Sequence, residues 1–246
     1  MLSIVVAILA GVAVSALFAL THLVHSTAGA ITPGVIVTLA VGILLFRRIG
    51  KMVNPIVEEA QRHMQGARFE LAVKSLRDAL RWHRWHPLLE SQLRTQIGII
   101  LYSQGDVDGA LPELRRGSSR PWESPAFLGC ACFKKRDDGS MTKAFEKAVK
   151  VGEKDGLAWT VYAWCLAARD KKAQAVAVLK RALEKLPADE RLKGNLELVE
   201  AGKKMKVAPY GERWARFGLD GSKPGVPKAM RGYAQRPGFR QRPSRR

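Results

Sequence analysis

The fold is decided by the stretch AWTVYAWCLAARDKKAQAVAVLKRALEKLP, which occupies residues 158–187. Its apolar residues recur every three or four positions in two runs, and polar residues around Asp170 separate the runs. This period is typical of helices that bury one face. Small residues at Ala163 and Ala175 would let the two helices approach closely, while the larger side chains fill the space between neighbouring pairs. The stretch therefore predicts a tightly packed helix pair that ends at Pro187.

The same alternation of small and large residues recurs upstream of this stretch. Small residues fall at intervals of roughly 34 residues, at Ala60, Gly98, Gly129 and Ala163. The chain between these points reads as helices separated by Gly-, Asp- and Pro-bearing turns, and no segment alternates like a strand. We therefore expect an all-α domain over residues 52–204, closed by a more highly charged helix at Glu190–Lys204.

This arrangement resembles the tetratricopeptide repeat (TPR), which places Trp, Leu-Gly and Tyr on its first helix and Ala, Phe, Ala and Pro on its second. The resemblance implies a TPR-like α-solenoid of four stacked repeats, although Arg94 takes a Trp position and Met141 an Ala position. An unrelated helical bundle is the alternative, because any close-packed helical protein alternates small and large residues. The residues expected to pack the repeats are Trp159, Ala163, Leu166, Ala175, Leu179, Ala182, Pro187, Leu128, Gly129, Phe145, Ala148, Gly98 and Ala110.

The resemblance also implies a function, because repeats of this family form a curved superhelix whose concave face binds peptides or other protein segments. Protein partners are therefore expected in the groove of the repeats, with no enzymatic activity, cofactor or metal. The sequence agrees by omission, since it has no Gly-rich phosphate loop, no H-E-x-x-H and no nucleophile elbow.

Residues 1–51 are expected to form a transmembrane hairpin. Two apolar stretches, residues 2–24 and 30–46, contain no Lys, Arg, Asp or Glu, and about twenty apolar residues suffice for a helix to cross a membrane. Arg47, Arg48 and Lys51 follow the second stretch, whereas the connector has no formal charge. Because basic residues are retained in the cytoplasm, we expect a multi-pass protein of the inner (plasma) membrane with both termini and the helical domain cytoplasmic.

Two other interpretations of the N-terminal region stay open. Ala28-Gly29-Ala30 has the small-x-small form that a signal peptidase accepts, although no Lys or Arg precedes the first apolar run. The second stretch has Pro33 and Gly34 near its start, which also suits a tilted or re-entrant helix.

Residues 205–246 are rich in Gly, Pro and Arg and are expected to form a disordered basic tail. From Lys203 onward, 13 Lys and Arg face 2 acidic residues, so this end carries +11 of the net charge of +19. Guanidinium groups and aromatic rings suit phosphate polyanions, and a membrane also offers anionic lipid. The residues expected to contact lipid, RNA or ribosome are Arg231, Arg236, Arg240, Arg242, Arg245 and Arg246.

One part of this tail has a helical spacing of its own. Tyr210, Trp214 and Phe217 are four and three residues apart, so residues 209–219 would form a short docking helix or pack back on the last repeat.

These observations favour a membrane-anchored adaptor that binds protein partners on the cytoplasmic side and assembles them into a complex. The alternative is a nucleic-acid or ribosome tether that acts through the basic tail. A third hypothesis places the hairpin inside a larger membrane complex, because small residues such as Gly11, Ser15 and Gly34 permit close helix contacts.

Overall fold

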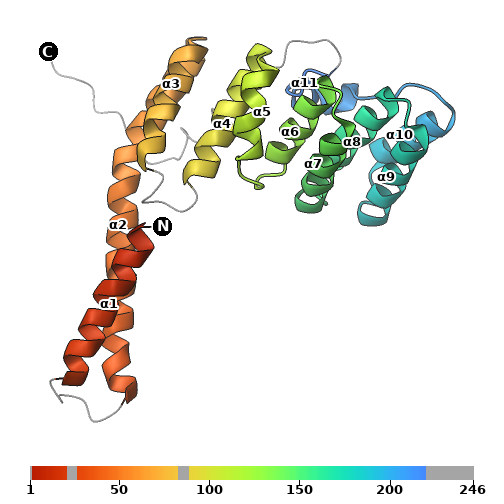
Figure 1. Cartoon of the computed structure of the whole chain (residues 1–246). Helices are drawn as coiled ribbons and strands as arrows, with labels where there is room; N and C mark the ends of the chain where they lie inside the picture. Colours follow the sequence, from red (N-terminus) through yellow and green to blue (C-terminus); the bar gives the residue numbers. More distant parts are fainter. Residues whose placement is uncertain (1, 21–26, 83–88, 220–246) are drawn as a thin grey trace, which may run out of the picture. The chain divides into compact units, whose positions relative to one another are not determined.

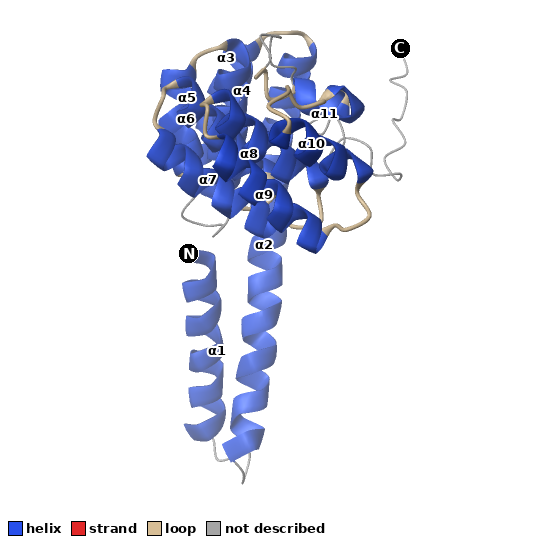
Figure 2. Cartoon of the chain, turned by 90° about the vertical axis from the view of Figure 1, so that its right-hand side faces the viewer, coloured by secondary structure: helices blue, strands red, loops and turns tan. Residues whose placement is uncertain are grey.

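The computed structural model describes residues 2–20, 27–82 and 89–219, and every regular element in these ranges is a helix (Figure 2). The expected all-α class is therefore confirmed for the described part of the chain. The chain forms two compact units, Met1–Leu93 and Arg94–Arg246. Each unit contains helices that lie side by side (Figure 1).

The described residues of the first unit form α1 (Leu2–Leu20), α2 (Thr27–Gln65), α3 (Phe69–Ala79) and the first turn of the next helix. A single 3-10 turn, Leu80–Trp82, follows α3. The boundary expected between residues 51 and 52 falls within α2, which continues from the apolar stretch into the first helix of the repeat region. Ala60 on α2 and Ala72 on α3 are both buried, as a close helix pair requires.

The α1 and α2 helices touch through glycines. A Cβ added at Gly11 would lie 2.5 Å from the carbonyl oxygen of Gly34 and would collide with the side chain of Thr38. The reverse holds as well, because a Cβ at Gly34 would meet the Gly11 carbonyl and the side chain of Ser15. Small residues at this spacing bring membrane helices into backbone contact. Gly11, Ser15 and Gly34 thus lie at the contact between α1 and α2.

Only one helix in the described part of the chain is long and apolar enough to be a candidate membrane span. It is α2 from Thr32 to Gln65, with a mean hydropathy of 1.6 over its apolar window. The apolar part of α1 that qualifies, Ile4–Leu17, is shorter than the roughly 20 residues that a span needs. The multi-pass arrangement expected from the sequence is therefore not supported, and the structure gives a single candidate span.

The outer surface of both helices is nevertheless apolar. Large hydrophobic side chains are exposed along α1 and along the same half of α2, at Ile4, Val5, Val6, Ile8, Leu9, Val12, Leu17, Val35, Ile36, Leu39, Ile43 and Leu44. Water-soluble proteins rarely expose apolar surface of this extent, and such a patch marks contact with lipid or protein.

Among its described residues, the second unit contains three helix pairs, a closing helix and one further short helix (Figure 1). Its helices are α4 (Leu89–Gln104, whose first turn precedes the unit boundary), α5 (Val107–Arg115), α6 (Glu123–Lys134), α7 (Asp138–Val151), α8 (Gly156–Ala168), α9 (Lys172–Lys185), α10 (Glu190–Glu200) and α11 (Glu212–Ala215). Four of them begin at an aspartate whose carboxylate accepts a backbone N–H of the first turn. These caps are Asp106, Asp137, Asp155 and Asp189.

The turn between the two helices is the same in all four pairs. Each turn contains one residue with a positive φ, at Ala67, Gly105, Arg136 and Asp170. The next residue donates its N–H to the carbonyl oxygen five positions back, over N···O distances of 2.8 to 3.0 Å. This is the hydrogen bond that closes a helix after a left-handed residue. The four pairs therefore share one local geometry, although their sequences have diverged.

Small residues make the pairs of the second unit close. A Cβ at Gly98 would lie 2.6 Å from the Leu114 side chain, and Ala163 and Ala175 are fully buried. Arg94, which takes a Trp position of the repeat, instead forms an ion pair of 2.8 Å with Glu113. A charged pair thus stands at the repeat position that Trp159 occupies in the last repeat.

Candidate functional site

In the second unit the first helices of the pairs, α4, α6 and α8, share one face that residues 205–219 cover. We call this surface the first-helix face; its residues are Tyr102, Trp122, Phe127, Thr160 and Trp164. The covering segment, residues 205–219, includes α11 and is called the C-terminal segment. Four of its large apolar side chains are only 2–8% exposed, those of Met205, Tyr210, Trp214 and Phe217. The first-helix face is therefore covered by residues 205–219 of the same chain.

Phe217 is held by both its ring and its backbone. Its ring centre lies 4.8 Å from that of Phe127 and 6.1 Å from that of Trp122. Its carbonyl oxygen accepts a hydrogen bond of 2.6 Å from the hydroxyl of Tyr102, more than one hundred positions earlier in the chain. Burial raises the pKa of Tyr102 well above its usual value, so this hydroxyl stays a donor throughout the physiological range.

The middle of the C-terminal segment contacts α8. Trp214 packs edge-on against Trp164, with ring centres 5.5 Å apart (α11 and α8 in Figure 1). The hydroxyl of Tyr210 lies 2.8 Å from that of Thr160, and burial raises the pKa of Tyr210. Such aromatic pairs contribute about 0.5–1.5 kcal/mol beyond the area they bury.

Asn195 on α10 fixes the beginning of the C-terminal segment. Its side-chain oxygen accepts the N–H of Lys206 at 2.7 Å, and its amide nitrogen donates to the carbonyl oxygen of Lys206 at 3.2 Å. Asn195 is almost fully buried, and both of its polar groups bind the backbone of one residue, Lys206. The contact depends on the backbone of residue 206 and not on its side chain.

The charged contacts of the C-terminal segment are unequal. Arg213 forms an ion pair with Asp155, the capping residue of α8. Arg216 is half-buried, and its Nε has no hydrogen-bond partner among the described residues. Burial lowers the pKa of Arg216, although Glu123 favours its charged form. The guanidinium of Arg213 therefore has an acidic partner at the start of α8, whereas the Nε of Arg216 has no hydrogen-bond partner among the described residues.

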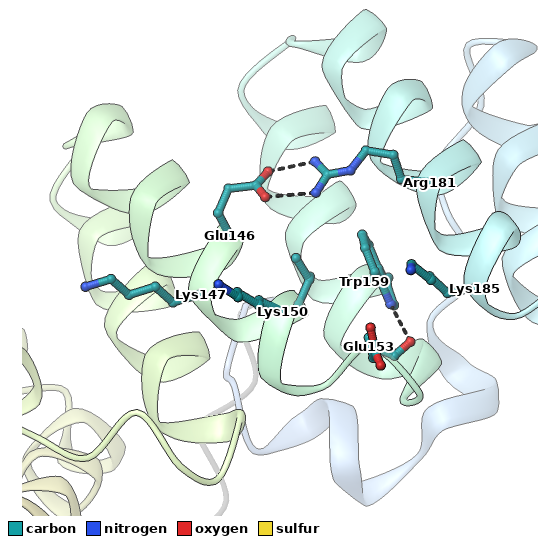
Figure 3. A pocket seen from close by; sticks show the side chains of 8 residues that line it. Glu146, Lys147, Lys150, Glu153, Trp159, Arg181 and Lys185 are labelled. Atoms are coloured by element: carbon teal, nitrogen blue, oxygen red, sulfur yellow. Dashed lines mark hydrogen bonds and ion pairs between the residues drawn. The ribbon is translucent and has the colours of Figure 1, made fainter.

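A separate pocket of about 410 Å³ is lined by residues of α7 and α9, by Trp159 of α8 and by Glu153 between α7 and α8 (Figure 3). The carboxylate of Glu146 on α7 accepts two hydrogen bonds of 2.9 Å from Arg181 on α9. These bonds hold the pKa of Glu146 below its usual value. The indole N–H of Trp159 donates to the carbonyl oxygen of Glu153 at 3.0 Å, and the Arg181 guanidinium lies 5.6 Å from the Trp159 ring centre.

Three lysines border this pocket: Lys147, Lys150 and Lys185. None of them forms an ion pair among the described residues. Figure 3 shows them around the fixed Glu146–Arg181 pair and the Trp159 ring. The pocket is therefore open and basic, and the Glu146–Arg181 pair and the Trp159 indole in it already form hydrogen bonds within the protein.

Most of the residues expected to pack the repeats are buried in the helix pairs. Trp159, Ala163, Leu166, Ala175, Leu179, Ala182, Gly98, Ala110, Gly129, Phe145 and Ala148 are buried, and Leu128 is half-buried. Pro187 is exposed and follows the end of α9 at Lys185. The basic residues expected to contact lipid or RNA, Arg231, Arg236, Arg240, Arg242, Arg245 and Arg246, lie outside the described residues.

The sequence did not indicate how far the C-terminal segment reaches. Its spacing suggested either a docking helix or packing on the last repeat, whereas the segment contacts first helices of three successive pairs, from Tyr102 to Thr160. Residues 205–219, which were grouped with the tail, pack with the repeats. The aromatic residues Tyr210, Trp214 and Phe217 were the available signal, and their partners depended on the tertiary fold.

Comparison with known proteins agrees with the geometry of the last pairs. Residues 143–190, which cover most of α7, all of α8 and α9 and the start of α10, match the family model of the tetratricopeptide repeat. No curated protein matches the chain. The chain thus contains a tetratricopeptide repeat at residues 143–190, within an array of helix pairs that share its turn geometry.

Proposed function

We propose that the protein is a membrane-anchored, non-enzymatic adaptor whose helical repeats bind protein partners on the cytoplasmic side of a membrane. The tetratricopeptide repeat at residues 143–190 carries this proposal, because such repeats suggest protein–protein interaction. The four equivalent turns extend the same architecture beyond the matched residues.

The apolar surface of α1 and α2 supports the anchoring part of the proposal. We propose that α2 spans the membrane with α1 packed against it through Gly11 and Gly34. Arg47, Arg48 and Lys51 follow the apolar stretch within α2, and the tendency of basic residues to stay in the cytoplasm would place the repeats there. Because α2 continues unbroken to Gln65, the first repeat helix would be a direct extension of the anchor.

The basic tail motivates a second candidate function, a nucleic-acid or ribosome tether. It carries most of the net positive charge of the chain, and phosphate contacts by Lys and Arg would make such binding fall steeply with salt. The two functions predict different effects of deleting the repeats and deleting the tail.

Affinity purification of crosslinked partners from native membranes separates these candidates. One variant lacks residues 89–219 and keeps α1–α3 and the tail; the other ends at Leu219 and keeps the C-terminal segment in place. The adaptor proposal expects partners to be lost with the first variant and retained with the second, with or without nuclease. Partners that survive loss of the repeats but disappear with the tail or after nuclease treatment would refute it and favour the tether.

A further inference from the structure

We infer that the first-helix face is a binding site for a basic, aromatic segment of a partner protein, and that the C-terminal segment occupies this site in cis until the partner displaces it. The inference rests on the proposed adaptor function and names the chemistry of the partner. Three observations on residues 205–219 support it: hydrogen bonds to their backbone, the ion pair of Arg213, and the half-buried guanidinium of Arg216.

Several of the contacts recognise peptide backbone. Asn195 binds both the N–H and the carbonyl oxygen of Lys206, and Tyr102 donates to the carbonyl oxygen of Phe217. Any segment whose backbone follows the same path, through a 3-10 turn and a short helix between these two points, would make the same hydrogen bonds. The first-helix face is thus equipped to bind a segment of another chain, since backbone hydrogen bonds supply affinity without fixing the sequence.

The side-chain contacts set the chemistry of the segment. Trp164 takes an aromatic ring from α11, and Trp122 and Phe127 take a second ring three residues further on. Asp155 takes a basic side chain adjacent to the first ring. The occupant that fits is therefore a short segment with two aromatic residues three positions apart and a basic residue next to the first.

The C-terminal segment is an imperfect occupant. Arg216 lies between its two anchoring aromatic residues in the sequence and is half-buried. Its pKa is lowered, and its Nε has no hydrogen-bond partner in the described part of the chain. Desolvating a guanidinium without a full set of partners is unfavourable. A partner with an uncharged residue at this point would bind the same face without that penalty.

Covalent attachment compensates for this mismatch. A segment on a short tether has an effective concentration in the millimolar range, so the cis contact persists although one charge is poorly placed. A partner segment competes with this tethered occupant. Its apparent association constant equals the intrinsic constant multiplied by the fraction of chains in which the first-helix face is open. The C-terminal segment would therefore set the threshold for partner binding.

The test uses a labelled peptide with the sequence of residues 205–219, MKVAPYGERWARFGL, and the full chain in detergent. The intact chain is compared with an opened chain that carries Trp214→Ala and Phe217→Ala. We expect the peptide to bind the opened chain more tightly than the intact chain by about tenfold or more. A peptide that carries the same two alanines should not bind either chain.

Two controls keep the result specific. Lys147→Glu with Lys150→Glu, on the pocket between α7 and α9, should leave peptide binding by the opened chain unchanged. An insertion of a protease site between Gly202 and Lys203 provides a second way to open the face, because both residues are exposed. After cleavage the original segment should exchange with the labelled peptide, which covers the case in which the double variant does not fold.

The inference is overturned if a folded opened chain or the cleaved chain does not bind the peptide, or if intact and opened chains bind it equally. It is also overturned if the lysine substitutions abolish binding, because the peptide would then occupy the other surface. In each case recovery of protein partners in the membrane experiment above would leave the adaptor function standing, so the two failures are distinguishable.

Discussion

Gly129→Ala should destabilise the protein because the first and second helices of its pair have no room for a methyl group. A Cβ at Gly129 would lie 2.7 to 2.8 Å from three ring atoms of Phe145. Phe145 is fully buried and stacks on Tyr162 with ring centres 5.2 Å apart. The ring therefore cannot move aside without disturbing the core, and overpacking of this kind costs about 1–3 kcal/mol.

Gly194→Ala in α10 is the matched control. No atom lies within 4 Å of a Cβ at Gly194, so this variant should gain only the helix propensity of alanine, about 1 kcal/mol. The same gain applies at Gly129, and the difference in free energy of unfolding between the two variants is then the packing cost, about 1–3 kcal/mol.

Urea and thermal unfolding of the full chain in detergent, followed by circular dichroism, measures this difference. For a domain of about 150–250 residues, each kcal/mol shifts Tm by about 2–4 °C. We expect the Gly129→Ala chain to unfold below the Gly194→Ala chain by about 2–12 °C. If both variants were stabilised equally, the close approach of α6 and α7 at Gly129 would be wrong.

Three further predictions concern the turns, the acid side of the stability curve and the C-terminal segment. Arg136→Gly should raise the free energy of unfolding and Gly105→Ala should lower it, each by about 1 kcal/mol, because both positions have a positive φ; urea unfolding checks the signs. The Glu146–Arg181 pair should stabilise the fold above the usual Glu pKa and stop doing so as pH falls through the lower folded value; the acid-side slope of stability against pH should therefore flatten in Glu146→Gln. Arg216→Met should slow hydrogen exchange of residues 205–219, because it removes a desolvated charge, and faster exchange would contradict this.

Helix content and the last repeat could be predicted from sequence because they depend on local spacing. Trp159, Ala163 and Ala175 repeat with a helical period, and the family match over residues 143–190 covers the same stretch. The earlier pairs were harder to identify because Arg94 and Met141 depart from the pattern. The pairs share a backbone conformation, a residue with positive φ after the first helix. At Ala67, Arg136 and Asp170 this residue is not a glycine, so the sequence does not indicate the conformation.

The candidate site could not be predicted in the same way because its two sides are far apart in the chain. Tyr102 and Phe217 are joined by one hydrogen bond, and nothing in either residue's own neighbourhood indicates the other. The aromatic spacing of the C-terminal segment indicated a buried face but not its partner. The continuous helix α2 was likewise hidden, because the change from apolar to charged residues near Arg47 suggested a boundary where the backbone has none.

Photocrosslinking from position 164 tests the central claim, that the first-helix face binds protein segments and is occupied in cis. The full chain, with a photoreactive residue in place of Trp164, is irradiated in native membranes in intact form and with Trp214→Ala and Phe217→Ala. We predict crosslinks to residues 205–219 in the intact chain and to a second polypeptide in the opened chain. Absence of crosslinks to residues 205–219, or equal crosslinking of both chains to the same second polypeptide, would contradict the account.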